Sequence, residues 1–321
     1  MQKLPPERPG ELQRRLFQIT EALSLEERNL YNNASGLTRA ADFIEEIFSC
    51  TGLSVFRQTF RVNGIACHSL EAVPQDFCGR QEPHWILGAH YDSAPGTPGA
   101  DDNTSAVAIL FETARLLTQS ENPPRNIRFV AYTNEEPPHF LNESMGSRVH
   151  AASCRKNADN LQGMICLESL GYFTDKPGSQ KLPTLFGMPK ETIDFTRSRG
   201  IEPTVGNYIA IVGDEQSASF LARFDDAFSR HPIPTLPLVM PEMRLSDHLY
   251  YWDEGFPALM LTDTALFRNP NYHKTTDTVE TLDFEAMASI TEIWFPPCEI
   301  SHWGRGVTPD SQFPMTPPPL T

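Results

Sequence analysis

Residues 84–136 read HWILGAHYDSAPGTPGADDNTSAVAILFETARLLTQSENPPRNIRFVAYTNEE, and this stretch decides the fold class. The runs HWILGAH, residues 84–90, and IRFVAYT, residues 127–133, have the length and apolar character of buried strands. The Gly/Pro-rich segment 93–103 between them cannot form regular structure, and residues 104–118 have the pattern of a helix that packs against a sheet. The order of strand, loop, helix and strand predicts an α/β fold.

The same alternation continues on both sides of this unit. Further strand-like runs lie at 53–62, 163–169, 235–240 and 257–263, and helical stretches lie at 38–51, 215–230 and 283–294. No break in composition divides the chain. We therefore predict one catalytic domain over residues 1–305, with a doubly wound, mostly parallel (mixed) sheet flanked by helices.

Two segments stand outside this pattern. Residues 173–190 have no clear period, so they form either a loop over the site or a mobile surface loop. Residues 306–321 contain five prolines and predict an extended or disordered tail.

The charge balance excludes several classes of partner. The 321-residue chain has 26 basic and 41 acidic residues and a net charge of -15, which opposes binding to nucleic acid or to an anionic membrane. Most of the excess acid is expected to be a solvated surface, so only clustered carboxylates carry information about function. The sequence makes no prediction of the oligomeric state.

The N-terminal segment and the cysteines bear on the cellular compartment. Residues 1–23 lack the apolar core of a signal peptide, and no later run has transmembrane length. The six cysteines are scattered without a CxxC motif, which argues against a cysteine zinc site or a disulfide scaffold. We expect a cytoplasmic protein with free thiols, and a bridge between Cys67 and Cys78 stays open.

Histidines and carboxylates gather where strands end. His90 and Asp92 stand two residues apart in GAHYDS, so they project to the same side, and Asp92 is suited to accept the N–H of a metal-binding His90. Consecutive acids follow in the loop GADDN, residues 99–103, and a carboxylate there has two oxygens with which to bridge two cations. Each motif alone has a commoner explanation, such as a surface pair or a helix N-cap.

Three further positions extend the set. Glu135 and Glu136 follow the strand IRFVAYT, and adjacent side chains diverge, so one can bind metal while the other transfers a proton. Glu168 ends the apolar run MICLES, where a buried carboxylate needs a partner of opposite charge or the surface. His273 lies in the loop NPNYHKTTDT, before the last helix.

Taken in order, HYDS, GADDN, NEE, LESLGY and YHKTTDT resemble the metallopeptidase family of bacterial leucine aminopeptidases, which also contains glutamate carboxypeptidases and glutaminyl cyclases. The resemblance extends from about residue 28 to about residue 288 and includes SDHLYYW, while residues 173–240 match poorly. It implies the zinc aminopeptidase fold and two Zn²⁺ ions per chain, although other divalent metals fit the same residue types.

The resemblance also implies a role for each position. Asp102 would bridge both zinc ions, Glu136 and His273 would complete one site, and His90 and Glu168 would complete the other. Many relatives have Asp in place of Glu168. Glu135 would be the general base and acid, Tyr272 the tyrosine that assists some relatives, and the peptide bond after Asp102 is expected to be cis.

These expectations predict an aminopeptidase that hydrolyses the N-terminal residue of a peptide substrate. Zinc lowers the pKa of bound water toward ~7, so a hydroxide is available at neutral pH. The alternatives are a zinc-dependent glutaminyl cyclase, a carboxypeptidase-type member and a binding protein on an inactive scaffold. Asp247 and His248 in SDH are interpreted first as a cap of the following helix and second as residues behind the site, and a role for Arg244 in binding a carboxylate stays open.

Overall fold

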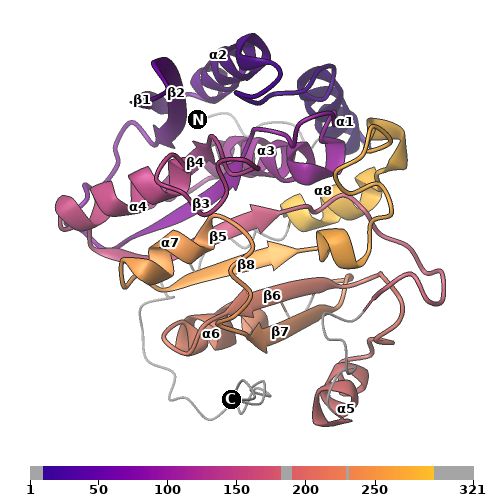
Figure 1. The fold of residues 1–321 in the computed structure, drawn as a ribbon. Helices are drawn as coiled ribbons and strands as arrows, with labels where there is room; N and C mark the ends of the chain where they lie inside the picture. The colour runs from indigo at the N-terminus through magenta and orange to yellow at the C-terminus, as the bar shows by residue number, and fades with distance from the viewer. Residues whose placement is uncertain (1–9, 182–189, 229–230, 293–321) are drawn as a thin grey trace.

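Eight strands form one mixed sheet through the middle of the computed structural model, which describes residues 10–181, 190–228 and 231–292 (Figure 1). Their order across the sheet is β1-β2-β4-β3-β5-β8-β6-β7. The strands are β1 Ser54–Val62, β2 Ile65–Val73, β3 His84–His90, β4 Ile127–Tyr132, β5 Leu161–Glu168, β6 Ile209–Gly213, β7 Thr235–Val239 and β8 Ala258–Thr262.

The centre of the sheet is parallel and its margins bring in antiparallel pairs. Strands β4, β3, β5 and β8 are parallel neighbours, whereas β1 with β2, β2 with β4, and β6 with β8 are antiparallel. The prediction of a mixed, mostly parallel sheet is confirmed. The carboxyl ends of the central strands therefore meet at one edge, where open α/β sheets bind ligands.

Helices cover both faces of the sheet (Figure 1). On one face α1 Glu11–Leu23, α2 Ala34–Cys50, α3 Ala106–Gln119, α6 Ala218–Phe228 and α8 Phe284–Glu292 form the larger core with alternate residues of the strands. On the other face α4 Gly146–Lys156 and α7 His248–Asp253 form a second core with the remaining residues. Ile86 and Leu87 of β3 show the alternation, because they point into opposite cores.

The helices predicted in the N-terminal half of the chain lie close to the observed ones. The helix expected at 38–51 begins four residues earlier, because Asn33 caps it by accepting a hydrogen bond from the amide of Gly36. The helix expected from Thr104 begins at Ala106, since residues 100–105 form a kinked turn in which Asp102 and Asn103 have non-helical backbone angles. Strand β2 was not predicted as a strand of its own.

The segment expected to be a loop at 173–190 is described as far as residue 181. Its backbone is tied at both ends, because the amide of Thr174 donates to Gly206 and that of Lys181 donates to Phe267. Residues 182–189, the tail 306–321 and the domain boundary at 305 lie outside the described residues. Helix α5, Lys190–Ser198, follows.

The structure bears on the predicted free thiols and on the predicted lack of a transmembrane segment. Cys50, Cys67, Cys78, Cys154 and Cys166 are all free thiols, so there is no bridge between Cys67 and Cys78. Among the described helices, none combines the length and apolar character that crossing a bilayer requires.

Candidate metal centre

The predicted metal ligands converge at the carboxyl edge of the central strands. His90 is the last residue of β3 and Glu168 the last residue of β5, while Glu136 follows β4 after four residues. Asp102 lies in the turn that leads into α3, and His273 lies in a loop after β8. Residues that are up to 183 positions apart in the sequence thus reach one place.

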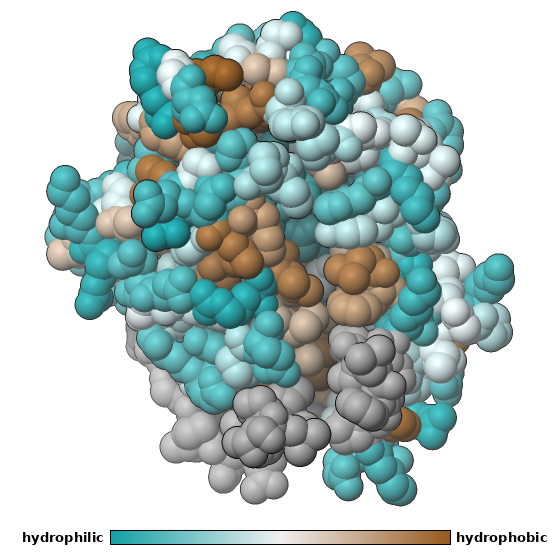
Figure 2. Space-filling model, viewed as in Figure 1, coloured by the Kyte–Doolittle hydropathy of each residue, from teal (hydrophilic) through white to brown (hydrophobic). Residues whose placement is uncertain are grey.

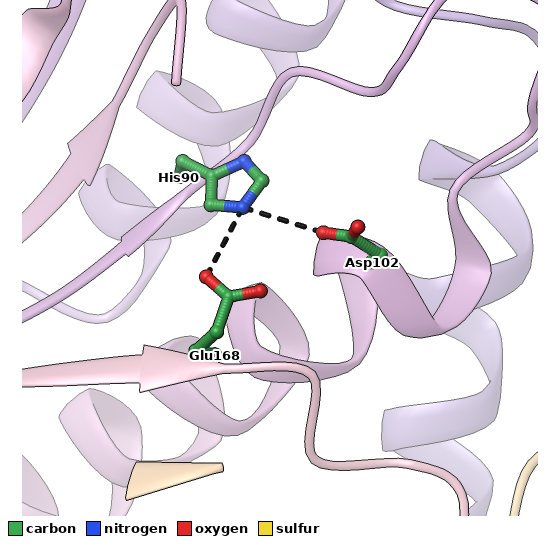
Figure 3. Close-up of side chains that lie close together, drawn as sticks. All are labelled: His90, Asp102 and Glu168. Atoms are coloured by element: carbon green, nitrogen blue, oxygen red, sulfur yellow. Dashed lines mark ion pairs between the residues drawn. The ribbon is translucent and has the colours of Figure 1, made fainter. Parts of the chain in front are cut away.

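His90, Asp102 and Glu168 form one group (Figure 3). The Nε2 atom of His90 lies 3.4 Å from Oδ1 of Asp102 and 3.3 Å from Oε2 of Glu168. Figure 3 shows the imidazole facing both carboxylates. All three residues are buried.

Asp102, Glu136 and His273 form a second group. The Nε2 atom of His273 lies 3.1 Å from Oδ2 of Asp102 and 3.1 Å from Oε2 of Glu136. The two oxygens of Asp102 therefore face two different histidines, which is the arrangement that a bridging carboxylate needs. The peptide bond between Asp102 and Asn103 is cis, as expected.

These groups fit divalent cations. Two atoms that each lie ~2.1 Å from one tetrahedral ion are ~3.4 Å apart, close to the observed separations. Two of the facing atoms, Nε2 of His90 and Oδ1 of Asp102, are buried without a hydrogen-bond partner, and so is the second oxygen of Glu136, Oε1; this is rare for polar atoms. Imidazole nitrogen and carboxylate oxygen are ligands that zinc prefers.

The charges around His90 and His273 also favour a bound cation. Burial lowers the pKa of His273, but the hydrogen-bonded Asp102 and Glu136 outweigh it and raise the pKa to about 10. Burial likewise opposes the charge on His90, yet Glu135 and Glu168 hold its pKa well above the ordinary value. The surroundings of both rings therefore favour positive charge, which protons supply here and which metal ions supply equally well.

Asp92 fixes the backbone beside the site. Its Oδ1 accepts the amide of Glu135 at 3.0 Å and its Oδ2 accepts the amide of Glu136 at 3.0 Å. Oδ1 also faces Nδ1 of His90, but at 3.5 Å, and this nitrogen has no hydrogen-bond partner. Asp92 thus orients the two glutamates more directly than it orients the imidazole.

Glu135 belongs to neither ligand group. Its Oε2 lies 3.8 Å from Nε2 of His90, and burial raises the pKa of Glu135 well above its ordinary value, with Glu136 and Glu168 adding to the shift. The carboxyl group is therefore free to hold and return a proton next to the ligands.

Tyr272 lies against the group formed by Asp102, Glu136 and His273. Its ring stacks on that of His273, with the centroids 3.9 Å apart and the planes 14° apart. Burial raises the pKa of Tyr272, and the surrounding carboxylates raise it further, so the hydroxyl keeps its proton at neutral pH. It is available as a hydrogen-bond donor.

Several residues that the sequence did not single out hold the ligands in place. The hydroxyl of Ser246 donates to Oε2 of Glu168 at 2.5 Å. The carboxylate of Asp277 accepts the amides of Asp101 and Asp102 at 2.9 and 3.3 Å. Asp101 points away from both groups and accepts the side chain of Asn269 at 2.6 Å.

The SDH motif and Arg244 differ from expectation. Asp247 precedes α7 but makes no capping hydrogen bond, so the interpretation as a helix cap was wrong. Its side chain is fully buried, with the charges of His90 and Glu168 nearby, and burial raises its pKa to about 7. Arg244 pairs with Asp253 at 2.7 Å on the surface and does not line the cavity described next.

A cavity opens beside the metal centre. Figure 2 shows hydrophobic side chains gathered around a hollow on the face of the molecule seen in Figure 1. One end of the cavity is lined by Asp102, Glu135, Glu136, Glu168 and His273. The larger part is apolar, with side chains from β6, β7, β8 and the neighbouring loops: Phe140, Ala210, Val212, Leu236, Leu238, Met240, Met243, Leu245 and Met260.

Residues 75–296, more than half of the chain, match the sequence model described as Peptidase family M28. The chain belongs to peptidase family M28. As a member of this family it is a hydrolase of the zinc exopeptidase class, which confirms the predicted family and enzyme class.

Two relatives of this M28 peptidase differ in coverage. The uncharacterized protein YfbL of Escherichia coli K12 is 37% identical over 275 residues, which are 81% of this chain and 79% of that protein. The probable lipoprotein aminopeptidase LpqL of Mycobacterium tuberculosis is 33% identical over 63% of this chain, but the match covers only 39% of LpqL.

Solved structures of low identity share the fold of this M28 peptidase. The LapA aminopeptidase of Legionella pneumophila superposes with a TM-score of 0.67 at 17% identity, covering 91% of this chain and 75% of LapA. The glutaminyl cyclase of Porphyromonas gingivalis superposes with a TM-score of 0.60 at 15% identity, covering 91% of this chain and 98% of the cyclase.

Proposed function

We propose that this M28 peptidase is an aminopeptidase that uses two zinc ions to hydrolyse the N-terminal peptide bond of apolar-ended peptides. The observation that carries the proposal is the position of Asp102, whose two oxygens face His90 at 3.4 Å and His273 at 3.1 Å. Asp102, with Glu136 and His273, would hold one ion, and Asp102, with His90 and Glu168, would hold the other. Bound zinc supplies Lewis acidity and a lowered pKa for water.

The residues of the chain would divide the remaining work. Glu135 accepts a proton from the attacking water at its free carboxylate and returns it to the nitrogen of the leaving amine. The hydroxyl of Tyr272 donates a hydrogen bond to the carbonyl oxygen as negative charge develops on it. Asp92 keeps Glu135 and Glu136 at fixed positions through their backbone amides.

The charge of the cavity favours an aminopeptidase over a carboxypeptidase. Four carboxylates and His273 line its inner end, and no arginine or lysine is found among the described residues that line it. A carboxypeptidase has to hold the free C-terminal carboxylate of its substrate, and no arginine or lysine in the described part of this lining is available to pair with it. The lack of such a cationic side chain in the described lining thus disfavours a carboxypeptidase.

The apolar wall favours a peptidase over a glutaminyl cyclase. A glutamine side chain in contact with Val212, Leu238 and Met260 would lose hydrogen bonds to water without replacement. A leucine or methionine side chain there would gain ~25 cal/mol for each Å² of apolar surface that leaves water. Glu135, a free carboxyl beside both ligand groups, argues against a binding protein without activity.

The test combines metal analysis with two reactions. Zinc content, release of amino acid from aminoacyl anilides, and cyclisation of N-terminal glutamine are measured for the wild type, Glu135→Gln and Glu143→Gln. Glu143 is an exposed acid of the same loop and serves as the matched control. We expect two zinc ions in all three proteins, and a loss of anilide hydrolysis of 10²-fold to 10⁴-fold only in Glu135→Gln.

Equal hydrolysis by the wild type and Glu135→Gln would remove Glu135 as the base. Cyclisation without release of amino acid would replace the peptidase by the cyclase.

A further inference from the structure

Arg28 is among the largest fully buried side chains of the described residues, with 1% of its surface exposed. It lies in the connection between α1 and α2, far in sequence from every candidate ligand. A buried guanidinium needs partners for all its N–H groups, because an unpaired buried charge is costly.

Most partners of the Arg28 side chain belong to one loop, which we call the bridge loop and which consists of residues 91–104. Its Nε donates to the carbonyl of Tyr91 at 2.8 Å, and its Nη1 donates to the carbonyl of Pro98 at 2.7 Å. Its Nη2 donates to the carbonyl of Gly99 at 3.2 Å and to the hydroxyl of Thr104 at 2.8 Å. One side chain thus holds the beginning, the middle and the end of the bridge loop.

The backbone of Arg28 adds two contacts to the same loop. Its amide donates to the hydroxyl of Ser93 at 3.0 Å, and its carbonyl accepts the amide of Ser93 at 3.0 Å. Nη1 also donates to the carbonyl of Leu23 at 2.6 Å, which ties the end of α1 to this point. The contact is therefore built from two segments that the sequence separates by more than 60 residues.

The bridge loop connects two of the candidate ligands, His90 and Asp102. His90 comes directly before it, and Asp102 lies within its last three residues. Packing at Gly99 shows how closely the loop fits around Arg28, since a Cβ atom there would lie 2.4 Å from the carbonyl of Asp102 and 3.1 Å from Nη2 of Arg28. A shift of the guanidinium would therefore be passed on to Asp102.

The charge of Arg28 suits its surroundings. Burial lowers the pKa of Arg28 to about 10, while the carboxylates Asp92, Asp277, Asp102 and Glu136 act in the opposite sense, so the group stays charged at neutral pH. It faces the acidic centre from behind, and none of its hydrogen bonds is to a candidate ligand side chain.

We propose that Arg28 is a positioning residue of the metal centre: through the bridge loop it holds the carboxylate of Asp102 where it faces both His90 and His273, and so sets the affinity for zinc. The inference rests on the two-zinc function proposed above. The position of Asp102 then depends on the shape of the guanidinium and not on its charge alone. The five donors of the guanidinium lie in a planar fork and reach carbonyls at separate points of the loop.

Lysine separates shape from charge. Arg28→Lys keeps the positive charge but has three donors on one nitrogen, so it cannot hold Tyr91, Pro98, Gly99 and Thr104 together. If only the charge acted, Lys would preserve the affinity.

The experiment measures zinc binding by the full chain. Zinc is removed with a chelator, and its dissociation constants and stoichiometry are measured by competition with a chromophoric chelator, together with Tm before and after zinc addition. The variants are Arg28→Lys, Thr104→Val and Arg128→Lys. Arg128 is equally buried, at 1% exposure, but pairs with Asp159 at 2.7 Å and contacts neither the bridge loop nor a candidate ligand.

We expect Arg28→Lys to weaken zinc binding by 10-fold to 100-fold, as for other residues that orient metal ligands, and Thr104→Val to weaken it several-fold. Arg128→Lys should lower Tm equally with and without zinc and leave the dissociation constants unchanged. Unchanged or tighter binding in Arg28→Lys would overturn the inference. If Arg28→Lys does not fold, Thr104→Val decides, and an unchanged affinity in that variant overturns it.

The two proposals fail in different ways. A wild-type protein that binds fewer than two zinc ions refutes the two-zinc function. Two zinc ions held with the same affinity by the wild type and Arg28→Lys refute only the role of Arg28.

Discussion

In the absence of zinc, the free energy of unfolding of this peptidase should decrease as the pH rises from 5 to 8. The reason is the excess of buried acid at the metal centre. Burial raises the pKa of Glu136 to about 8 and that of Asp247 to about 7, with Asp102 and Glu168 respectively among the charges that add to the shift. His273, whose pKa is raised to about 10, holds a proton in the same region.

The sign follows from proton binding. A carboxyl group with a raised pKa binds its proton more tightly in the folded than in the unfolded chain, so stability is lost as the pH rises from the unfolded pKa to the folded pKa. A histidine with a raised pKa contributes stability that is complete below its unfolded pKa of ~6.5 and is lost as the pH rises through the folded pKa. Both kinds of group therefore destabilise the zinc-free protein at higher pH.

The magnitude can be worked out for Glu136 alone. One proton difference between the folded and unfolded states changes the free energy of unfolding by ~1.4 kcal/mol for each pH unit. Between pH 5 and pH 7, Glu136 is protonated in the folded chain and ionised in the unfolded chain, so its contribution falls by about 3 kcal/mol. Asp247 and His273 act in the same direction, which makes this figure a lower bound for the three groups.

The assay is urea unfolding of the zinc-free and zinc-loaded proteins at pH 5, 6, 7 and 8. We expect a steady loss of stability with pH for the zinc-free protein and a smaller loss for the loaded protein, because bound cations take the place of the protons on Glu136 and His273. Glu136→Gln removes one of the titrating groups and should reduce the slope in the zinc-free protein. A zinc-free wild type that is as stable at pH 8 as at pH 5 would refute the reasoning.

Three further outcomes follow from single contacts. Tyr272→Phe should lower kcat for anilide hydrolysis by about 10²-fold with two zinc ions still bound, and a normal kcat would exclude its hydroxyl as a donor to the carbonyl oxygen. Phe140→Ala should raise KM for leucyl substrates by about 10-fold while kcat is kept, because Phe140 forms part of the apolar wall, and an unchanged KM would place the substrate side chain elsewhere. Ser246→Ala should weaken zinc binding by 10-fold to 100-fold, since the hydroxyl orients Glu168, and the measured dissociation constants decide.

The position of the site could be predicted from the sequence because strand ends are visible in it. His90 and Glu168 each close an apolar run, and parallel strands bring their carboxyl ends to one edge of a sheet. Which of Asp101 and Asp102 faces the ligand groups could not be worked out from the residues, because the two neighbours are chemically identical. In the structure the amide of Asn269 and the backbone of Gly171 hold Asp101 on the opposite side.

Other parts of the site left no signal in the sequence. Arg28 stands in a polar segment, and most of its partners are backbone carbonyls, which any sequence provides. Asp247 was misinterpreted as a helix cap because Asp is common at that position, whereas its side chain is turned inward behind the ligand groups. Strand β2 carries Cys67, His68 and Glu71, and so lacks the simple alternation of a half-buried strand.

The number of metal ions can be argued from the charges that the fold buries together. Five carboxylates lie in or directly beside the two ligand groups, namely Asp92, Asp102, Glu135, Glu136 and Glu168. Arg28 provides one positive charge nearby, while Asp247 and Asp277 add further buried acid, so an excess of acid remains to be balanced in a region from which water is largely excluded. Two divalent ions balance more of this acid than one ion does, and buried charge without compensation is costly unless protons are taken up. The acid content of this centre therefore favours two zinc ions over one.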